Sequence, residues 1–222
     1  MFTPDTLAFL AENRFQNSKD WFTAHEKEYT AFVKEPMSAL HEALAPAMLN
    51  IDGQFQVHPR NALSRIWCDL RFSHGNLYRE MMWITYRRDR KAFAAWPEFY
   101  IVFSPTEFFY GCGYYAAKSE AMDEIRAMIR SDHDAYRAAK ESLDAQNVFR
   151  VSGELYKRSR FPDESPEKRL WLDRKSIGFS CAPGVDALFD PHLAEKLAAQ
   201  FTKIRPVYEF LTAAEERAAR KE

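Results

Sequence analysis

Apolar residues recur at helical spacing in the N-terminal part of the chain. Thr3 followed by Pro4 is typical of a helix start, and Asn17 is the expected cap of a second helix. The stripe of that second helix recurs at intervals of four, four and three residues and consists of Trp21, His25, Tyr29 and Phe32. We expect this stripe to form one buried face, with His25 as a hydrogen-bonded core residue.

Prolines divide the rest of the N-terminal helical region. Pro36 is expected to end or kink the second helix, and Pro46 to interrupt a further helical segment at 37–51.

A second helical region begins near residue 119. Ser119 is the expected cap of a helix with Met122, Ile125 and Ile129 on its apolar face, and Ser131 that of another helix ending near 143. A last helix is expected to start at Asp190 and to bend at Pro206. Its apolar stripe comprises Leu193, Leu197, Phe201, Ile204, Tyr208 and Leu211.

The period changes from helical to alternating in the middle of the chain. Ile66, Cys68, Leu70 and Phe72 alternate with four other residues, Arg65, Trp67, Asp69 and Arg71. This alternation predicts a strand with one apolar and one polar face. Cys68 would then be a small buried hydrophobe.

Three more apolar runs, YREMMWITY, FYIVFS and EFFYGCGYY, predict further strands, and SPTE between the last two predicts a hairpin turn. Gly111 and Gly113 indicate a bulge or a close backbone approach. The irregular segment 153–181 has room for one more strand and a short helix. We therefore predict one α+β domain over residues 1–222, with an antiparallel sheet of about four to six strands flanked by N-terminal and C-terminal helices.

Charge is unevenly distributed in this chain, whose formal net charge is only -1. Residues 60–91 carry eight basic and three acidic side chains, and residues 153–175 carry seven and five. Two readings remain open, a local surface that attracts anions and an ordinary solvated surface of mixed charge.

Familiar catalytic motifs and metal-ligand spacings are absent from the sequence. Cys68, Cys112 and Cys181 include no CxxC pair, and the six histidines share no ligand spacing. We expect neither a metal nor an organic cofactor. No apolar run approaches the roughly 18 residues that a membrane span needs, and no signal peptide is evident, so a cytoplasmic location is expected.

The polar face of the predicted strand at 65–72 is the first candidate site. Alternate residues of a strand are about 6.7 Å apart, so Asp69 and Arg71 can pair directly while Arg65 lies too far along to join them. An arginine fork suits phosphate and carboxylate groups. The alternative is a structural ladder of ion pairs.

A second basic segment, YKRSRFPDESPEKR, would complete a pocket if it folded over that strand face. Its candidate residues are Tyr156, Lys157, Arg158 and Arg160. The predicted ligand-binding residues of the two segments together are Arg65, Asp69, Arg71, Tyr78, Arg79, Lys157 and Arg158.

Four stretches, FLAENRFQNSKDWFTAHEKEY, RIWCDLRFSHGNLYRE, GCGYYAAKSEAMDEIRAMI and GELYKRSRFPDESPEKRLWL, resemble in order and spacing the conserved hypothetical proteins of domain of unknown function 2461. The family features matched here are Asn17, Trp21, Phe22, Asp69, Arg71, Phe72, Tyr78, Gly113, Arg126 and Lys157. Cys68 stands where the family usually has arginine, and the loop at 73–80 departs from the family's Lys- and Pro-rich pattern. The resemblance implies no particular reaction.

Two functions of different classes fit these observations. The first is binding of, or action on, a small anionic metabolite without a cofactor, and whether the protein is an enzyme stays open. The second is a non-catalytic module whose exposed aromatic residues and arginines contact another protein. Nucleic-acid binding is suggested by the interleaved arginines and aromatics at 83–93 but is disfavoured by the near-neutral charge.

Overall fold

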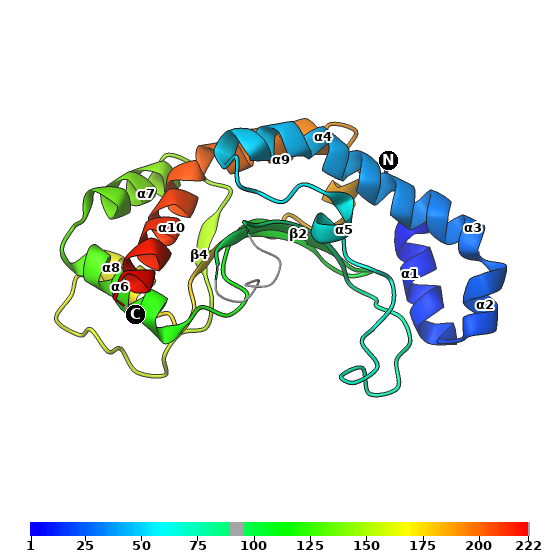
Figure 1. Ribbon diagram of the computed structural model, residues 1–222, viewed down its shortest axis with the longest axis horizontal. Coiled ribbons are helices and arrows are strands. Elements are labelled where there is room, and N and C mark those ends of the chain that lie inside the picture. The colour runs from blue at the N-terminus through cyan, green and yellow to red at the C-terminus, as the bar shows by residue number, and fades with distance from the viewer. Residues whose placement is uncertain (89–95, 222) are drawn as a thin grey trace. The chain divides into compact units, whose positions relative to one another are not determined.

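The computed structural model describes residues 1–88 and 96–221 (Figure 1). They fall into two compact units, each made of separate stretches of the chain. Unit 1 comprises Met1–Tyr86, Tyr100–Tyr110 and Ala182–Ala198, and unit 2 comprises Arg87–Phe99, Gly111–Cys181 and Ala199–Glu222. Part of the segment considered for nucleic-acid binding, 89–93, lies outside the described residues.

An antiparallel sheet, with helices before and after it in the chain, confirms the predicted α+β class. Its five strands within the described residues follow the hydrogen-bonded order β1-β2-β3-β5-β4. Their bounds are Met82–Tyr86 for β1, Glu98–Phe103 for β2, Phe108–Gly113 for β3, Arg150–Ser152 for β4 and Gly178–Cys181 for β5.

The predicted hairpin joins β2 to β3. The backbone N–H of Ser104 donates to the carbonyl of Glu107 at 2.8 Å, and the Ser104 hydroxyl accepts from the N–H groups of Thr106 and Glu107. The predicted close approach at Gly113 is also confirmed, because a Cβ there would lie 2.6 Å from the Cα of Gly178. The short strand β4, which we did not predict, pairs with β5 from Arg150↔Ser180 to Ser152↔Gly178.

The N-terminal helices of unit 1 follow one another closely along the chain. They are α1 Pro4–Gln16, α2 Lys19–Ala24, α3 Glu26–Tyr29, the π-helical turn η1 Thr30–Lys34, α4 Glu35–Ile51 and the short α5 Pro59–Ala62. Thr3 and Pro4 start α1 as predicted. Asn17 instead closes α1 in the left-handed conformation, and the cap of α2 is Ser18, whose hydroxyl accepts from the N–H of Trp21.

The two prolines have different effects in unit 1. Pro36 marks an element boundary, because the π-helical turn η1 ends at Lys34 and α4 begins at Glu35 with Pro36 in its first turn. Pro36 has no N–H to offer to the carbonyl of Phe32, and the hydroxyl of Thr6 donates to that carbonyl at 2.7 Å instead. The missing hydrogen bond coincides with the π-helical turn η1, which lies just before Pro36. Pro46 lies within α4, which continues to Ile51. Leu44 before the proline and Met48 after it are both buried, so packing holds the helix together on either side of Pro46.

The predicted stripe of the second helix is less buried than expected. Trp21, His25, Tyr29 and Phe32 are all half-exposed, whereas Phe22 is buried. Phe22 packs against the rings of Tyr78 and Trp67, with centroids 4.9 and 5.1 Å away. His25 bonds through Nδ1 to the carbonyl of Trp21 at 2.7 Å, so its hydrogen bond lies within its own helix.

The prediction of a strand at 65–72 is wrong. Only one isolated bridge forms at 65–72, between Trp67 and Tyr78, and the chain turns from residue 70 onward. The Asp69 carboxylate accepts from the N–H of Arg71 at 3.1 Å, and the carbonyl of Asp69 accepts from the N–H of Phe72 at 3.0 Å. This local bonding competes with a strand ladder. It leaves Leu70 and Phe72 63% and 74% exposed, and Cys68 is half-exposed rather than buried.

Unit 2 packs its helices around an aromatic core. These helices are α6 Ser119–Arg130, α7 Asp134–Asp144, α8 Pro166–Leu172 and α10 Arg205–Ala219. The ring of Trp171 lies 4.9 Å from that of Phe179 and 6.0 Å from that of Phe210, and Tyr136 meets Trp171 edge to face at 5.3 Å.

Helix boundaries in this part of the chain differ slightly from those predicted. Lys118 rather than Ser119 precedes α6, and His133 rather than Ser131 caps α7, with its Nδ1 accepting from the N–H of Ala135. The apolar face of α6 is buried as predicted. The last predicted helix is two helices, α9 Leu193–Lys203 and α10, preceded by the 3-10 turn η2 Val185–Phe189. Every member of its predicted stripe is buried.

Candidate anion-binding site

Asp69 and Arg71 pair directly, as predicted, but across a turn rather than along a strand. Arg71 Nη2 lies 2.6 Å from Asp69 Oδ2, and Nε donates to Oδ1 at 3.0 Å. The hydrogen bonds from the Arg71 side chain and backbone lower the pKa of the Asp69 carboxyl to about 2. Both side chains remain open to solvent, so Asp69 already neutralises Arg71 on the surface.

The other predicted residues of unit 1 have different surroundings. Tyr78 is fully buried against Phe22 and Trp67, so it belongs to the core of unit 1 rather than to a ligand surface. Arg79 donates through Nε to the carbonyl of Trp67 at 3.1 Å, and its guanidinium lies 4.6 Å from the ring centroid of Trp83. Arg65 is exposed.

Asn17 holds the loop that follows Arg71. Its amide donates to the carbonyl of Gly75 at 3.0 Å, and its side-chain oxygen accepts from the N–H of Leu77 at 2.7 Å. Arg14 adds a bond from Nη1 to the carbonyl of Tyr78 at 3.0 Å. The N-terminal helices therefore position this loop.

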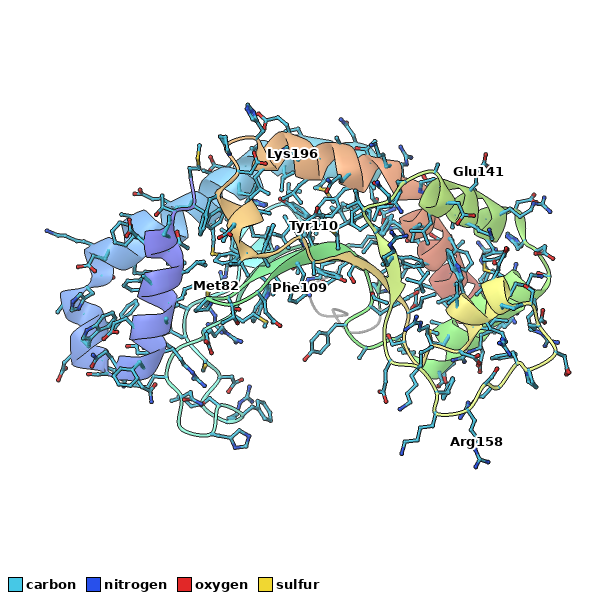
Figure 2. All side chains as sticks on the ribbon, turned by 180° about the vertical axis from the view of Figure 1, so that it is seen from behind. Met82, Phe109, Tyr110, Glu141, Arg158 and Lys196 are labelled. Atoms are coloured by element: carbon cyan, nitrogen blue, oxygen red, sulfur yellow. The ribbon has the colours of Figure 1, made fainter. Side chains whose placement is uncertain are left out.

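In unit 2 the predicted residues Lys157 and Arg158 lie in the loop that joins β4 to α8. Both are exposed, and Figure 2 shows Arg158 pointing away from the ribbon. Asp173 anchors the start of the loop, because its carbonyl accepts from the N–H of Tyr156 at 2.9 Å and its carboxylate from the N–H of Arg160 at 3.0 Å.

Two arginines flank the ring of Tyr156. The Cζ atom of Arg160 lies 3.9 Å from the ring centroid, and that of Arg126 lies 5.7 Å away. Arg126 also donates through Nη2 to the Tyr156 hydroxyl at 3.1 Å and to the carbonyl of Arg174 at 3.0 Å. We call Arg126, Tyr156, Lys157, Arg158 and Arg160 the Tyr156 cluster.

The arginines around this ring differ in how far they are neutralised. Arg126 pairs with Asp123 at 2.9 Å. Arg174 donates to the carbonyls of Gly153 and Leu170, and burial lowers the pKa of its guanidinium. Within residues 1–88 and 96–221, Arg160 forms no ion pair, and the same holds for its neighbours Lys157 and Arg158.

Tyr156 and Arg160 are candidates from the sequence alone, whereas Arg126 is matched there only as a family residue and is not assigned to this site. Arg126 lies on α6, about 30 residues before Tyr156, and only the fold brings the two together. The predicted residues of the two segments belong to different units, 65–79 to unit 1 and 156–160 to unit 2. Their union in one pocket therefore remains a prediction.

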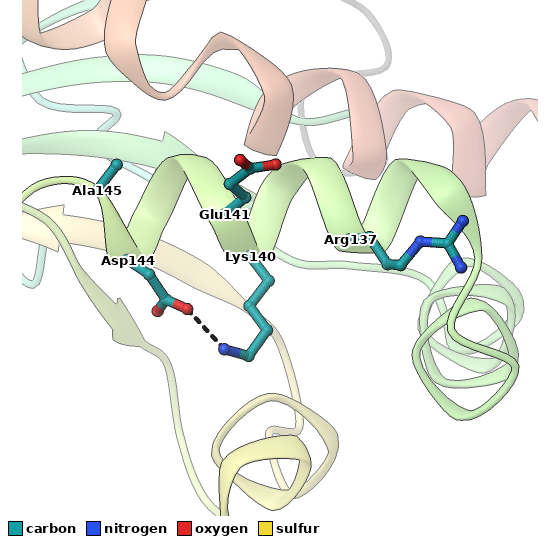
Figure 3. A pocket seen from close by; sticks show the side chains of 5 residues that line it. All are labelled: Arg137, Lys140, Glu141, Asp144 and Ala145. Atoms are coloured by element: carbon teal, nitrogen blue, oxygen red, sulfur yellow. Dashed lines mark hydrogen bonds and ion pairs between the residues drawn. The ribbon is translucent and has the colours of Figure 1, made fainter.

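A shallow depression of about 460 Å³ on α7 is not a candidate (Figure 3). Lys140 and Asp144 on its wall already pair with each other at 2.6 Å, and Arg137 pairs with Asp134. Three of its charged side chains, Arg137, Lys140 and Asp144, are thus already paired with neighbours one helical turn away.

No set of three or more His, Cys, Asp or Glu side chains suited to a metal ion occurs in the described part of the chain. Likewise, no helix among these residues is long and apolar enough to cross a membrane.

A family model described as conserved hypothetical protein (DUF2461) matches residues 5–210. The chain belongs to this family. None of the curated proteins compared with this DUF2461 protein matches it. The matched range covers the helices of unit 1, the sheet and the Tyr156 cluster.

The residues on which the resemblance rests have definite positions in this DUF2461 protein. Asn17, Phe22 and Tyr78 fix the loop after Arg71 to the N-terminal helices. Gly113 allows the close approach of β3 and β5, and Arg126 positions Tyr156. Five of the ten residues therefore have a structural role, and Lys157 is exposed.

Proposed function

We propose that this DUF2461 protein binds a small phosphate- or carboxylate-bearing ligand at the Tyr156 cluster. The observation that carries the proposal is the position of Arg160. Its guanidinium is held on the ring of Tyr156, yet no carboxylate neutralises it in the described part of the chain. A guanidinium in this position is ready to donate a pair of hydrogen bonds to an oxyanion.

Preorganisation supports the proposal. The Tyr156 hydroxyl accepts from Arg126, and the backbone of the loop is tied to Asp173 at residues 156 and 160. A ligand that meets an arginine already held in place loses less side-chain entropy on binding. Lys157 and Arg158 add two exposed positive charges, which raise the local concentration of anions.

The group around Arg65, Asp69 and Arg71 is the weaker anion site. The Arg71 side chain already donates two hydrogen bonds to Asp69, and an incoming anion would have to compete with that carboxylate. Arg65 and Arg79 remain candidates for a weaker contact. The proposal concerns binding and includes no reaction.

We further propose that the protein works in a reducing compartment such as the cytoplasm. Its three free cysteines support this location.

A thermal-shift titration with inorganic phosphate, pyrophosphate and citrate tests the proposal. A ligand of the native protein raises the melting temperature with the logarithm of its concentration. Arg160→Gln and Lys157→Gln should weaken this stabilisation, Arg160→Gln by about 10-fold or more in Kd because a charge-assisted bond is lost.

Arg65→Gln is the matched control, since it removes an exposed arginine of unit 1. If Arg65→Gln abolishes stabilisation and Arg160→Gln does not, the anion site lies in unit 1 and the assignment to the Tyr156 cluster is wrong. If none of the three anions stabilises the wild-type protein, anion binding itself is contradicted.

A protein-interaction module is the second candidate function. It is favoured by the exposed apolar side chains of Leu70 and Phe72, which lie at the tip of the loop fixed by Asn17. Under this alternative, the replacement of both by serine abolishes capture of a specific partner and leaves the anion titration unchanged.

A further inference from the structure

An open groove in unit 1 lies between α1 and the helical run from α2 to η1. Its volume is about 410 Å³, and its aromatic wall consists of Phe9, Trp21, His25 and Phe32. Trp21 stacks on His25 with ring centroids 4.1 Å apart and planes inclined by 15°. Phe9 supports Trp21 from α1 at 5.7 Å. The groove uses none of the residues of the Tyr156 cluster.

The polar part of the groove wall is acidic. Asp5 and Glu12 from α1 and Glu28 from α3 line it, and no lysine or arginine does so within the described residues. All three carboxylates are exposed. Glu12 accepts a hydrogen bond from Gln16, and none of the three forms an ion pair in the part of the chain that the structure describes. The groove therefore combines aromatic faces with uncompensated negative charge.

This combination is complementary to an organic cation. The face of a tryptophan ring attracts an ammonium or guanidinium group, and a nearby carboxylate adds direct charge pairing. An anionic ligand would meet repulsion from three carboxylates, and a purely apolar one would leave them without partners. Charge complementarity thus selects lysine and arginine side chains.

The spacing and openness of the groove favour a peptide over a small molecule. Asp5 and Glu12 are seven residues apart on α1, or about 10 Å along the helix axis, so a single cation cannot meet both. Small-molecule sites usually enclose most of their ligand, whereas Trp21, His25 and Phe32 stay half-exposed along this groove. An extended chain with several basic side chains fits such a surface.

The π-helical turn contributes one wall residue. Phe32 lies in η1, and its carbonyl accepts from Thr6 of α1 in place of the missing N–H of Pro36. This bond ties η1 to α1 next to the groove. Single π-helical turns are frequent at functional sites because they change which side chains a helix presents.

From these observations we propose that the groove formed by Phe9, Trp21, His25 and Phe32 and edged by Asp5, Glu12 and Glu28 binds a lysine- or arginine-rich segment of a partner protein.

Fluorescence polarisation with a labelled tetra-arginine peptide tests this proposal on the full-length protein. We expect saturable binding that weakens as salt is added, because exposed charges are screened. Glu28→Gln should raise Kd about 5-fold or more. Trp21→Leu, which keeps an apolar side chain but removes the ring face, should raise Kd by a similar factor.

Glu26→Gln is the matched control, since Glu26 is exposed on the same short helix as Glu28 but does not line the groove. Unchanged binding by this variant supports the groove. Equal weakening by Glu26→Gln and Glu28→Gln would show non-specific attraction and overturn the proposal, as would the absence of binding at millimolar peptide.

A competition experiment with spermine distinguishes a basic peptide from a small polyamine as the ligand of the groove. If spermine displaces the peptide at a concentration equal to the peptide's own Kd, the groove binds small polyamines and the peptide assignment is wrong. Arg160→Gln should leave peptide binding unchanged, so the failure of this proposal is distinguishable from that of anion binding at the Tyr156 cluster.

Discussion

Neighbouring aromatic residues on α2 have opposite surroundings. Phe22 is buried among the rings of Tyr29, Trp67 and Tyr78, whereas Trp21 is half-exposed on the wall of the groove. We therefore expect Phe22→Ala to lower the free energy of unfolding by about 3–5 kcal/mol, as for other large-to-small changes in a core.

Trp21→Ala should have a clearly smaller effect on the free energy of unfolding, since much of its ring is already in contact with solvent. Urea denaturation of both variants measures the difference. A larger loss for Trp21→Ala than for Phe22→Ala would contradict the observed burial.

Buried Glu98 on β2 predicts a dependence of stability on pH. Burial raises the pKa of the Glu98 carboxyl from 4.5 to about 7, although Arg87 Nη1 lies 3.0 Å from Oε2 and favours the ionised form. The native state therefore holds a proton that the unfolded state releases above pH 4.5. The contribution of protonated Glu98 to the free energy of unfolding is fully present below about pH 4.5. It is lost as the pH rises towards 7.

The Glu98→Gln variant should lack this loss. A pKa difference of about 2.5 corresponds to about 3 kcal/mol, so the stability of Glu98→Gln relative to wild type should rise by up to that amount from pH 4.5 to pH 7. Urea unfolding at intervals of half a pH unit provides the curve. A relative stability that stays flat, or falls, over this range would exclude a raised pKa for Glu98.

Sequence patterns predicted individual residues well where one local signal dominated. The stripe of α6 is buried because its period matches one helical face, and Gly113 lies where only a residue without a side chain allows β3 and β5 to approach. Prediction failed at Asp69, because alternation of apolar and polar residues says nothing about a side chain that bonds to the backbone two residues later. Near Pro36 the carbonyl of Phe32 accepts a hydrogen bond from Thr6, 26 positions away, and a contact over that distance could not be inferred from the local pattern.

At the scale of elements, we predict that replacing Gly153, just after β4, by alanine destabilises the protein much more than replacing Gly53. Gly153 has φ +109, and a Cβ there would lie 2.0 Å from the carbonyl oxygen of Ser176. Gly153→Ala should therefore destabilise the protein by about 2–4 kcal/mol, through the strained backbone and the steric clash.

Gly53→Ala is the matched control for Gly153→Ala, since no atom lies within 4 Å of its added Cβ. Its melting temperature should stay within a degree or two of the wild-type value. Equal melting temperatures for the two variants would contradict the close approach of residues 153 and 176.

The Tyr156 cluster was only partly predictable from the sequence, because its residues come from two elements. The basic run formed by Lys157, Arg158 and Arg160 is evident in the sequence, and Lys157 and Arg158 are predicted from it as ligand-binding residues. The contribution of α6 is not predicted, because the pattern of an amphipathic helix does not reveal which distant ring a polar-face arginine contacts. Arg126 meets Tyr156 only through the packing of unit 2.

At the scale of the whole molecule, the chain passes several times between the two compact units. The division falls within β2, between Phe99 and Tyr100, and within β3, between Tyr110 and Gly111. A strand that belongs partly to each unit is expected to couple their unfolding. We predict one cooperative transition, in keeping with the single domain inferred from the sequence.

Calorimetry tests this cooperativity. The calorimetric and van't Hoff enthalpies of unfolding should agree, and circular dichroism and tryptophan fluorescence should give coincident transitions. Two resolved transitions would instead show that the units are independent domains.

The most direct test of anion binding at the Tyr156 cluster is an NMR titration that follows the arginine Nε–Hε signals while pyrophosphate is added. We predict that the signal of Arg160, assigned through the Arg160→Gln variant, shifts saturably, whereas that of Arg71, already bonded to Asp69, stays in place. A saturable shift of Arg71 with an unchanged Arg160 signal would contradict it.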